Sequence, residues 1–188
     1  MLTGLANDVK ETLIKVITSA GDVVGVTRDT TKKTIIDTIK GAGEVTTTTL
    51  DVVTNVVEGA SAAVSESGKS TSDGVAGVVE GAVDAAQEVG ADVGTAVKES
   101  AQGAIRGVSD VGGDLGEAGV GAVRGAIAAA SKIGDDTTLA ATHAVIGVIK
   151  AADAIGSEAG NLVKKALLST AALPREIIQA AIGKAEKE

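Results

Sequence analysis

The sequence predicts an all-α protein made of tandem amphipathic helical repeats, and three observations support this prediction. A unit of 22 residues recurs without insertion or deletion through residues 78–165, and its phase extends toward both ends of the chain. Each unit consists of two 11-mers, and 11 residues correspond to three helical turns of about 3.67 residues each. Apolar and charged residues lie on opposite sides of that helical wheel, whereas a strand would require strict alternation. We therefore expect long helices that fold back on one another into an antiparallel array or bundle.

Columns of identical or similar residues run through the aligned units. The first column consists of Gly81, Gly103, Gly125 and Gly147, the second of Gly90, Gly112, Gly134 and Gly156, and the third of Val89, Val111, Ile133 and Ile155. Glycines also occur in pairs four residues apart, and such spacing lets two helix backbones approach closely. We therefore expect these three columns to be helix-packing positions.

The repeat phase and the local composition divide the chain into four segments. They are residues 1–64, with helical repeats rich in Thr, Val and Ile; 65–74, a polar loop; 75–169, with repeats rich in Gly and Ala; and 170–188, a short C-terminal helix with a charged tail. Within the first segment, helices are expected over residues 2–40 and 44–64, with an interruption at 41–43.

Further helix boundaries are expected within and after the Gly/Ala-rich segment. Helices should break at Gly112-Gly113-Asp114 and at Gly134-Asp135-Asp136, because Gly can end one helix as a left-handed cap and Asp can cap the next. Leu173-Pro174-Arg175 should open the last helix, since Pro is tolerated in a first turn.

Composition limits the classes of partner. The chain has 188 residues, a net charge of −8, no aromatic residue and no cysteine. An acidic chain without aromatic side chains lacks the means to bind nucleic acid, and it is repelled by strongly anionic membranes. The N-terminal sequence has neither a basic region nor an uninterrupted apolar core, so no secretory signal is expected. The expected location is the cytoplasm, with the periphery of a membrane or granule as the alternative.

Motifs for chemistry are incomplete. Gly68-Lys69-Ser70-Thr71 resembles the end of a phosphate-binding loop, but Ala63 occupies the place of the first glycine of that motif. His143 is the only histidine, and its column is otherwise charged, which predicts a position on the solvent side. We therefore predict no catalytic residue, no cofactor, no metal site and no small-molecule substrate.

The repeat resembles three families of amphipathic helical proteins. The stretches VVEGAVDAA, VKESAQGAIRGV and NVVEGASAAV are similar to the 11-mers of synucleins, the 22-mers of exchangeable apolipoproteins and the 11-mers of late-embryogenesis-abundant proteins. The resemblance implies a helix that lies on a lipid or hydrophobic surface, or one that orders on drying. The chain departs from synucleins by lacking paired lysines, and from apolipoproteins by lacking large anchoring residues and regular prolines.

Two functions follow as alternatives. The first is a non-enzymatic structural protein that associates with copies of itself through small-residue helix faces, forming an oligomer, filament or shell. The second is a coat on a lipid, droplet or granule surface, or a protectant against stress and desiccation. Residue size favours the first, because Ala and Gly supply little apolar area for lipid insertion but allow close helix packing.

Overall fold

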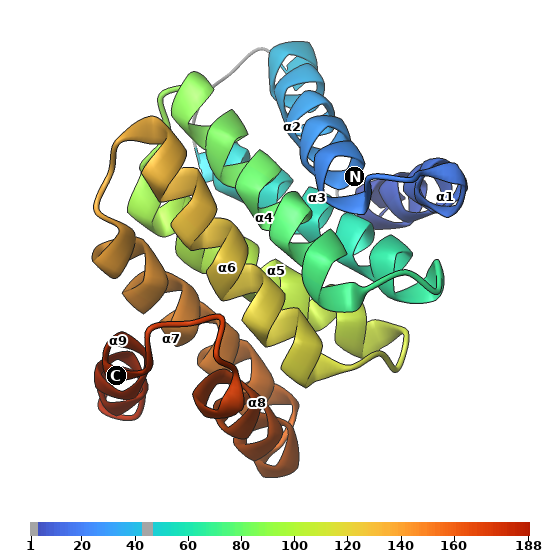
Figure 1. Ribbon diagram of the computed structural model, residues 1–188. Helices are drawn as coiled ribbons and strands as arrows, with labels where there is room; N and C mark the ends of the chain where they lie inside the picture. Colours follow the sequence, from blue (N-terminus) through green and yellow to red (C-terminus); the bar gives the residue numbers. More distant parts are fainter. Residues whose placement is uncertain (1–3, 43–46) are drawn as a thin grey trace.

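The computed structural model describes residues 4–42 and 47–188, and its regular elements are nine α-helices (Figure 1). Their bounds are α1 (Leu5–Ser19), α2 (Val23–Ala42), α3 (Thr47–Glu66), α4 (Thr71–Glu88), α5 (Val93–Asp110), α6 (Leu115–Ile133), α7 (Thr137–Ile155), α8 (Ser157–Ser169) and α9 (Arg175–Ala185). The prediction of an all-helical packed array is confirmed.

The helices form two layers, because helices α1 to α7 and α9 each pack most extensively on a helix two places away in the chain, while α8 packs on both α7 and α6. One layer contains α2, α4, α6 and α8, and the other contains α1, α3, α5, α7 and α9. Neighbours within a layer run parallel, since Gly77 of α4 faces Val24 of α2 and Gly81 faces Arg28 one turn further on. Consecutive helices alternate in direction, as Figure 1 shows for α4, α5, α6 and α7.

Four successive helices begin at residues 71, 93, 115 and 137, which are 22 residues apart. The turn before each of them has the same local chemistry. At Gly112 and Gly134 the backbone is left-handed, with φ of 69° and 75°, and Asp114 and Asp136 accept hydrogen bonds from the first turn of the next helix. Both predicted breaks are therefore confirmed. An equivalent turn at Gly90, which the sequence analysis did not predict, separates α4 from α5.

Single helices of 11 to 20 residues replace the long helices that the sequence suggested. The reason is that a left-handed glycine and a capping side chain recur between successive helices from α3 to α7. The predicted polar loop of residues 65–74 is also shorter than expected, because α3 continues to Glu66 and α4 already begins at Thr71. The expected interruption reaches Gly43, and the expected helix starts fall at Leu2 and Glu44; these three residues lie outside the described ranges.

One continuous core of aliphatic side chains lies between the layers. It consists mainly of Val and Ala, and among its largest fully buried members are Leu13, Ile17, Ile105, Ile149 and Ile178. Such small side chains fill space only if the helices approach closely, because a packed interior leaves few voids. The core therefore depends on the glycines at the helix contacts.

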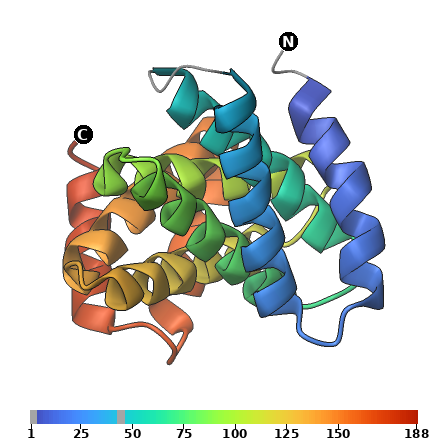
Figure 2. The ribbon, with the colours of Figure 1, turned by 90° about the horizontal axis from the view of Figure 1, so that it is seen from above.

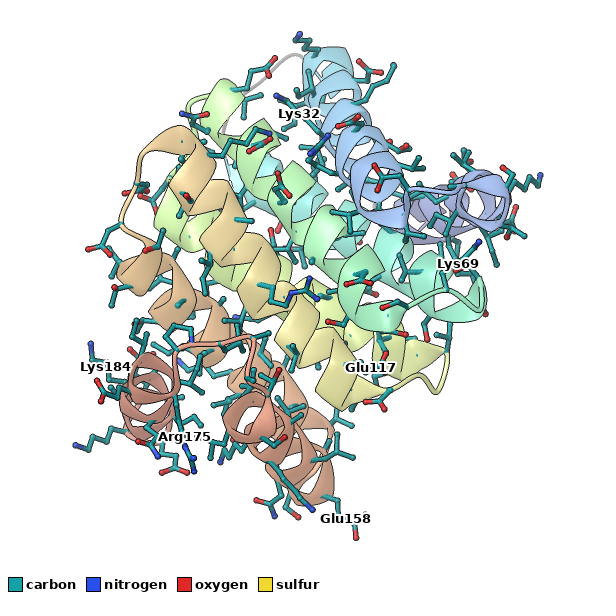
Figure 3. All side chains as sticks on the ribbon, in the orientation of Figure 1. Lys32, Lys69, Glu117, Glu158, Arg175 and Lys184 are labelled. Atoms are coloured by element: carbon teal, nitrogen blue, oxygen red, sulfur yellow. The ribbon has the colours of Figure 1, made fainter. Side chains whose placement is uncertain are left out.

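The first and last helices lie at opposite ends of the stack (Figure 2). The outer face of α1 exposes Glu11, Thr12 and Lys15, and that of α9 exposes Arg175 and Glu176. Figure 3 shows Arg175 and Lys184 pointing away from the fold at the C-terminal end. Polar outer faces on terminal units are typical of repeat stacks, whose interior faces would otherwise be exposed to water.

Candidate functional site

The first glycine column lies where helices of one layer meet. Gly81 of α4 faces the carbonyl of Arg28 on α2, and Gly125 of α6 faces that of Ala76 on α4. A Cβ atom at either position would lie closer than 3.0 Å to that backbone, a separation that real Cβ atoms do not show. The equivalent pairs in the other layer are Gly103 with Thr54 and Gly147 with Lys98, at 2.9 and 2.5 Å from an added Cβ to the carbonyl oxygen.

The second glycine column has a different place, which corrects the packing hypothesis for its four members. An added Cβ at any of them would have no atom within 4 Å. Three adopt positive φ at helix ends, where the next backbone N–H groups bond back to the helix; Gly113 N, for example, donates to Val108 O at 2.9 Å. The fourth, Gly156, has extended backbone with φ of 164°. The column consists of Gly90, Gly112, Gly134 and Gly156.

The third column lies at the C-terminal ends of helices. Val89 and Val111 are the C-cap residues of α4 and α5, and Ile133 is the last residue of α6; all three are half-buried. Ile155, the last residue of α7, is 46% exposed. These side chains lie at the edge of the core and not at the close helix contacts.

Ion pairs connect neighbouring helices within the layers. In the layer of α2, α4 and α6, Glu80 lies 3.7 Å from both Arg28 and Lys132. Lys132 also binds Asp84, a carboxylate that is only 4% exposed. Arg124 of α6 donates to Asp73 of α4 at 3.0 Å. These acidic and basic groups join successive helices, and the Asp residues before α5, α6 and α7 cap them.

His143 does not lie on the solvent side, and the sequence prediction is wrong at this position. Its ring is half-buried on α7 and lies against Gly94, where an added Cβ would be 2.8 Å from Nδ1. Nδ1 is buried and has no hydrogen-bond partner in the described part of the chain. The reason for the error is tertiary: Gly94 on α5 leaves a space that the column pattern of α7 could not reveal.

Charged groups surround this histidine. Hydrogen bonds from Thr95, together with the charge of His143, lower the pKa of Asp92 below the ordinary value. Glu188 lies 2.9 Å from Lys150 and 3.9 Å from Lys98, and the hydrogen bond from Lys150 is the main cause that lowers the pKa of Glu188. These contacts hold the C-terminal residue, which follows α9, against α5 and α7.

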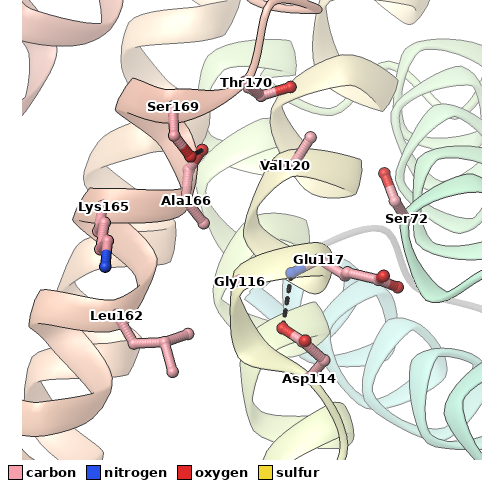
Figure 4. A pocket seen from close by; sticks show the side chains of 10 residues that line it. All are labelled: Ser72, Asp114, Gly116, Glu117, Val120, Leu162, Lys165, Ala166, Ser169 and Thr170. Carbon is pink, nitrogen blue, oxygen red and sulfur yellow. Dashed lines mark hydrogen bonds between the residues drawn. The ribbon is translucent and has the colours of Figure 1, made fainter.

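The most apolar of the larger grooves lies between α6 and α8, beside the start of α4 (Figure 4). It has a volume of about 470 Å³, and Val120, Leu162 and Ala166 form its apolar lining. Leu162 reaches from α8 toward α6 and is 51% exposed. The groove exists because α8 stands off from α6: Gly116 faces the side chains of Leu162 and Ala166 instead of a backbone carbonyl.

Signals in the sequence that could have located this groove are weak. Leu162 and Ala166 lie four residues apart, so they share a helix face, but nothing local shows that this face is left partly uncovered. The last helix pair departs from the 22-residue spacing, since α8 begins at Ser157, only 20 residues after Thr137.

Within residues 4–42 and 47–188, no group of three or more His, Cys, Asp or Glu residues could hold a metal ion. Among the described helices, α7 alone has the length and apolarity to cross a membrane, and 61% of its 18-residue window is buried inside the fold.

No protein-family model matches the chain, and no curated protein is significantly similar to it.

Proposed function

We propose that this chain is a non-enzymatic structural protein that folds into a two-layered helical stack and associates with copies of itself. The observation that carries the structural role is the recurrent contact, within the chain, between a glycine on one helix and a backbone carbonyl on the helix two places earlier. Such contacts gain dispersion energy and weak Cα–H···O bonds over a long helix interface. The same contact recurs between successive helices of each layer from α1 to α7, and such regular packing is typical of a structural scaffold.

The charged residues support a structural role as well. Carboxylates that could act as acids or bases instead cap helices, as Asp114 does, or pair with cations on the next helix of the layer, as Glu80 and Asp73 do. The first glycine column is covered by helices of the same chain. Self-association must therefore use residues outside that column, which changes the surface that the sequence suggested.

The alternative, a lipid coat, would require the stack to open, because the apolar faces of its helices form the core. Opening would expose the small side chains that now pack against each other, and those supply little insertion energy per residue. The membrane-length apolar helix α7 is the observation in favour of this alternative.

Sedimentation velocity and circular dichroism of the purified full chain test the proposal. Interference optics are needed, because no aromatic residue absorbs at 280 nm. The expected result is a helical protein whose sedimentation coefficient rises with concentration, unchanged by neutral or anionic vesicles. A chain that stays monomeric at all concentrations contradicts the proposal, and one that gains helix and floats with vesicles supports the coat instead.

A further inference from the structure

Charged residues of both signs line the groove between α6 and α8: Lys165 on α8, and Glu117 with the cap residue Asp114 at the start of α6. Lys165 lies on α8, three residues after Leu162, and Glu117 lies in the first turn of α6. Within the described residues, neither Lys165 nor Glu117 takes part in a salt bridge, whereas many other charged residues pair across neighbouring helices. Figure 4 shows Glu117 pointing from α6 toward Ser72 at the start of α4.

This distribution of charge is complementary to itself. In a two-fold dimer, a patch on one copy meets the same patch on the other, so that residue i contacts residue j and j contacts i. A positive group on one wall and a negative group on the other then pair twice across the axis. A ligand or peptide of a single charge sign would meet a repulsive wall, which favours a second copy as the occupant.

The apolar centre fits the same occupant. Leu162 is half exposed and lies over Gly116, with Cδ2 3.2 Å from the position of an added Cβ. Its covered half packs in its own chain, and its exposed half has the size and chemistry of an interface anchor at the middle of a polar rim.

We propose that two copies of the chain dock through the α6–α8 groove about a two-fold axis. The exposed half of Leu162 packs on Leu162 of the partner subunit, and Lys165 pairs with the partner's Glu117. This inference rests on the self-association proposed above, and it names the surface that association uses.

The test compares two matched variants, Leu162→Glu and Leu139→Glu. Both leucines are 51% exposed, so neither substitution places a charge in the core. Leu162→Glu is expected to weaken the dimer about 30-fold, as loss of a central anchor does, while Leu139→Glu leaves it unchanged. Circular dichroism melting curves of both variants verify that the fold is retained.

A charge exchange provides a second readout. Lys165→Glu and Glu117→Lys should each weaken the dimer several-fold by placing like charges across the axis, and the double variant should restore it to about the wild-type affinity.

Since the chain has no cysteine, Leu162→Cys should also form an intermolecular disulfide under oxidation, whereas Leu139→Cys should not.

The outcomes separate the two proposals. A wild-type chain that is monomeric at every concentration overturns both self-association and this interface. A self-associating wild type that Leu162→Glu does not weaken, or that Leu139→Glu weakens equally, overturns the interface alone. Binding of vesicles or of peptides at the groove by a chain that does not dimerise also overturns it.

Discussion

Glycine performs two distinct roles in this chain at the scale of single residues. At Gly112 the backbone has φ of 69° and open space where a Cβ would lie, so the requirement is conformational. At Gly125 the backbone is helical and the neighbouring Ala76 carbonyl leaves no room for a Cβ, so the requirement is steric. The same residue type in two columns of one repeat therefore responds to substitution by different rules.

Substitution of Gly112 tests the conformational role. Gly112→Ala should lower the free energy of unfolding by about 1–2 kcal/mol, because a left-handed backbone is unfavourable for residues with a Cβ. Gly112→Asn should cost less, since Asn tolerates this conformation better. Urea denaturation followed by circular dichroism at 222 nm measures both. Equal losses for the two variants would contradict the conformational explanation.

Glu58 makes the free energy of unfolding depend on pH. Burial on α3, and then the charge of Asp110, raise the pKa of Glu58, while Arg106 opposes the shift. The folded chain therefore binds more protons than the unfolded chain between the ordinary and the raised pKa. Stability from this group is present below the ordinary pKa and is lost as the pH rises through the raised value.

Glu58→Gln should remove the loss of stability that occurs as the pH rises through the raised pKa of Glu58. The variant should be more stable than the wild type at pH 7, by less than about 1 kcal/mol because the group is partly solvated, and the difference should vanish below a pH of about 4. Urea titrations at several pH values measure the effect, with Glu11→Gln on the exposed face of α1 as the control. A larger difference at low pH than at neutral pH would contradict the assigned sign.

At the scale of the element, the glycines fix how neighbouring helices of a layer meet. Because glycine has no side chain, the backbone of one helix can lie directly against the backbone of its parallel neighbour, and the two helices lie close together over most of their length. Ion pairs such as Lys132 with Asp84 and Arg124 with Asp73 flank the same contact between α4 and α6. The glycines set the separation of the helices, and the ion pairs fix their register.

Gly125→Ala should therefore destabilise the stack strongly. An added methyl group meets the Ala76 backbone, which cannot rotate away as a side chain can, and overpacking of this kind costs about 3 kcal/mol. Gly183→Ala is the matched control, because Gly183 is also helical and has nothing within 4 Å of an added Cβ.

For that control, the expected change has the opposite sign. Alanine should stabilise α9 by about 0.5–1 kcal/mol, since it has the better helix propensity. Thermal and urea denaturation of the two variants measures the contrast. If both substitutions stabilised the protein, the close contact between α4 and α6 would be refuted.

Sequence reasoning succeeded at this scale where the signals were local. Amphipathic period, Gly at a helix end and Asp two residues later act within one turn of chain, so the helical class and the breaks at Gly112 and Gly134 could be predicted. The pairing of helices two places apart could not, because the glycine face alone does not identify the carbonyl it meets. His143 and Leu162 were missed for the same reason: their surroundings come from other helices.

At the scale of the whole molecule, each helix depends on its neighbours in the stack. Interior helices have a partner on both sides within their layer, as α4 has α2 and α6, and α5 has α3 and α7. Terminal helices have a partner on one side only, as α1 has α3 and α9 has α7. In repeat stacks the stability of a unit is approximately its intrinsic stability plus the terms from its neighbours.

Hydrogen exchange should therefore reveal a gradient along the chain. Amides of α4, α5 and α6 should exchange most slowly, and those of α1 and α9 at least about 10-fold faster, because opening a terminal helix breaks one layer contact and opening an interior helix breaks two. Mass spectrometry of peptic fragments under native conditions resolves these segments. Gly125→Ala should then accelerate exchange in α4 and α6 before it does so in α1. Uniform exchange across the helices would show that the chain unfolds as one cooperative unit, with no contribution that depends on position in the stack.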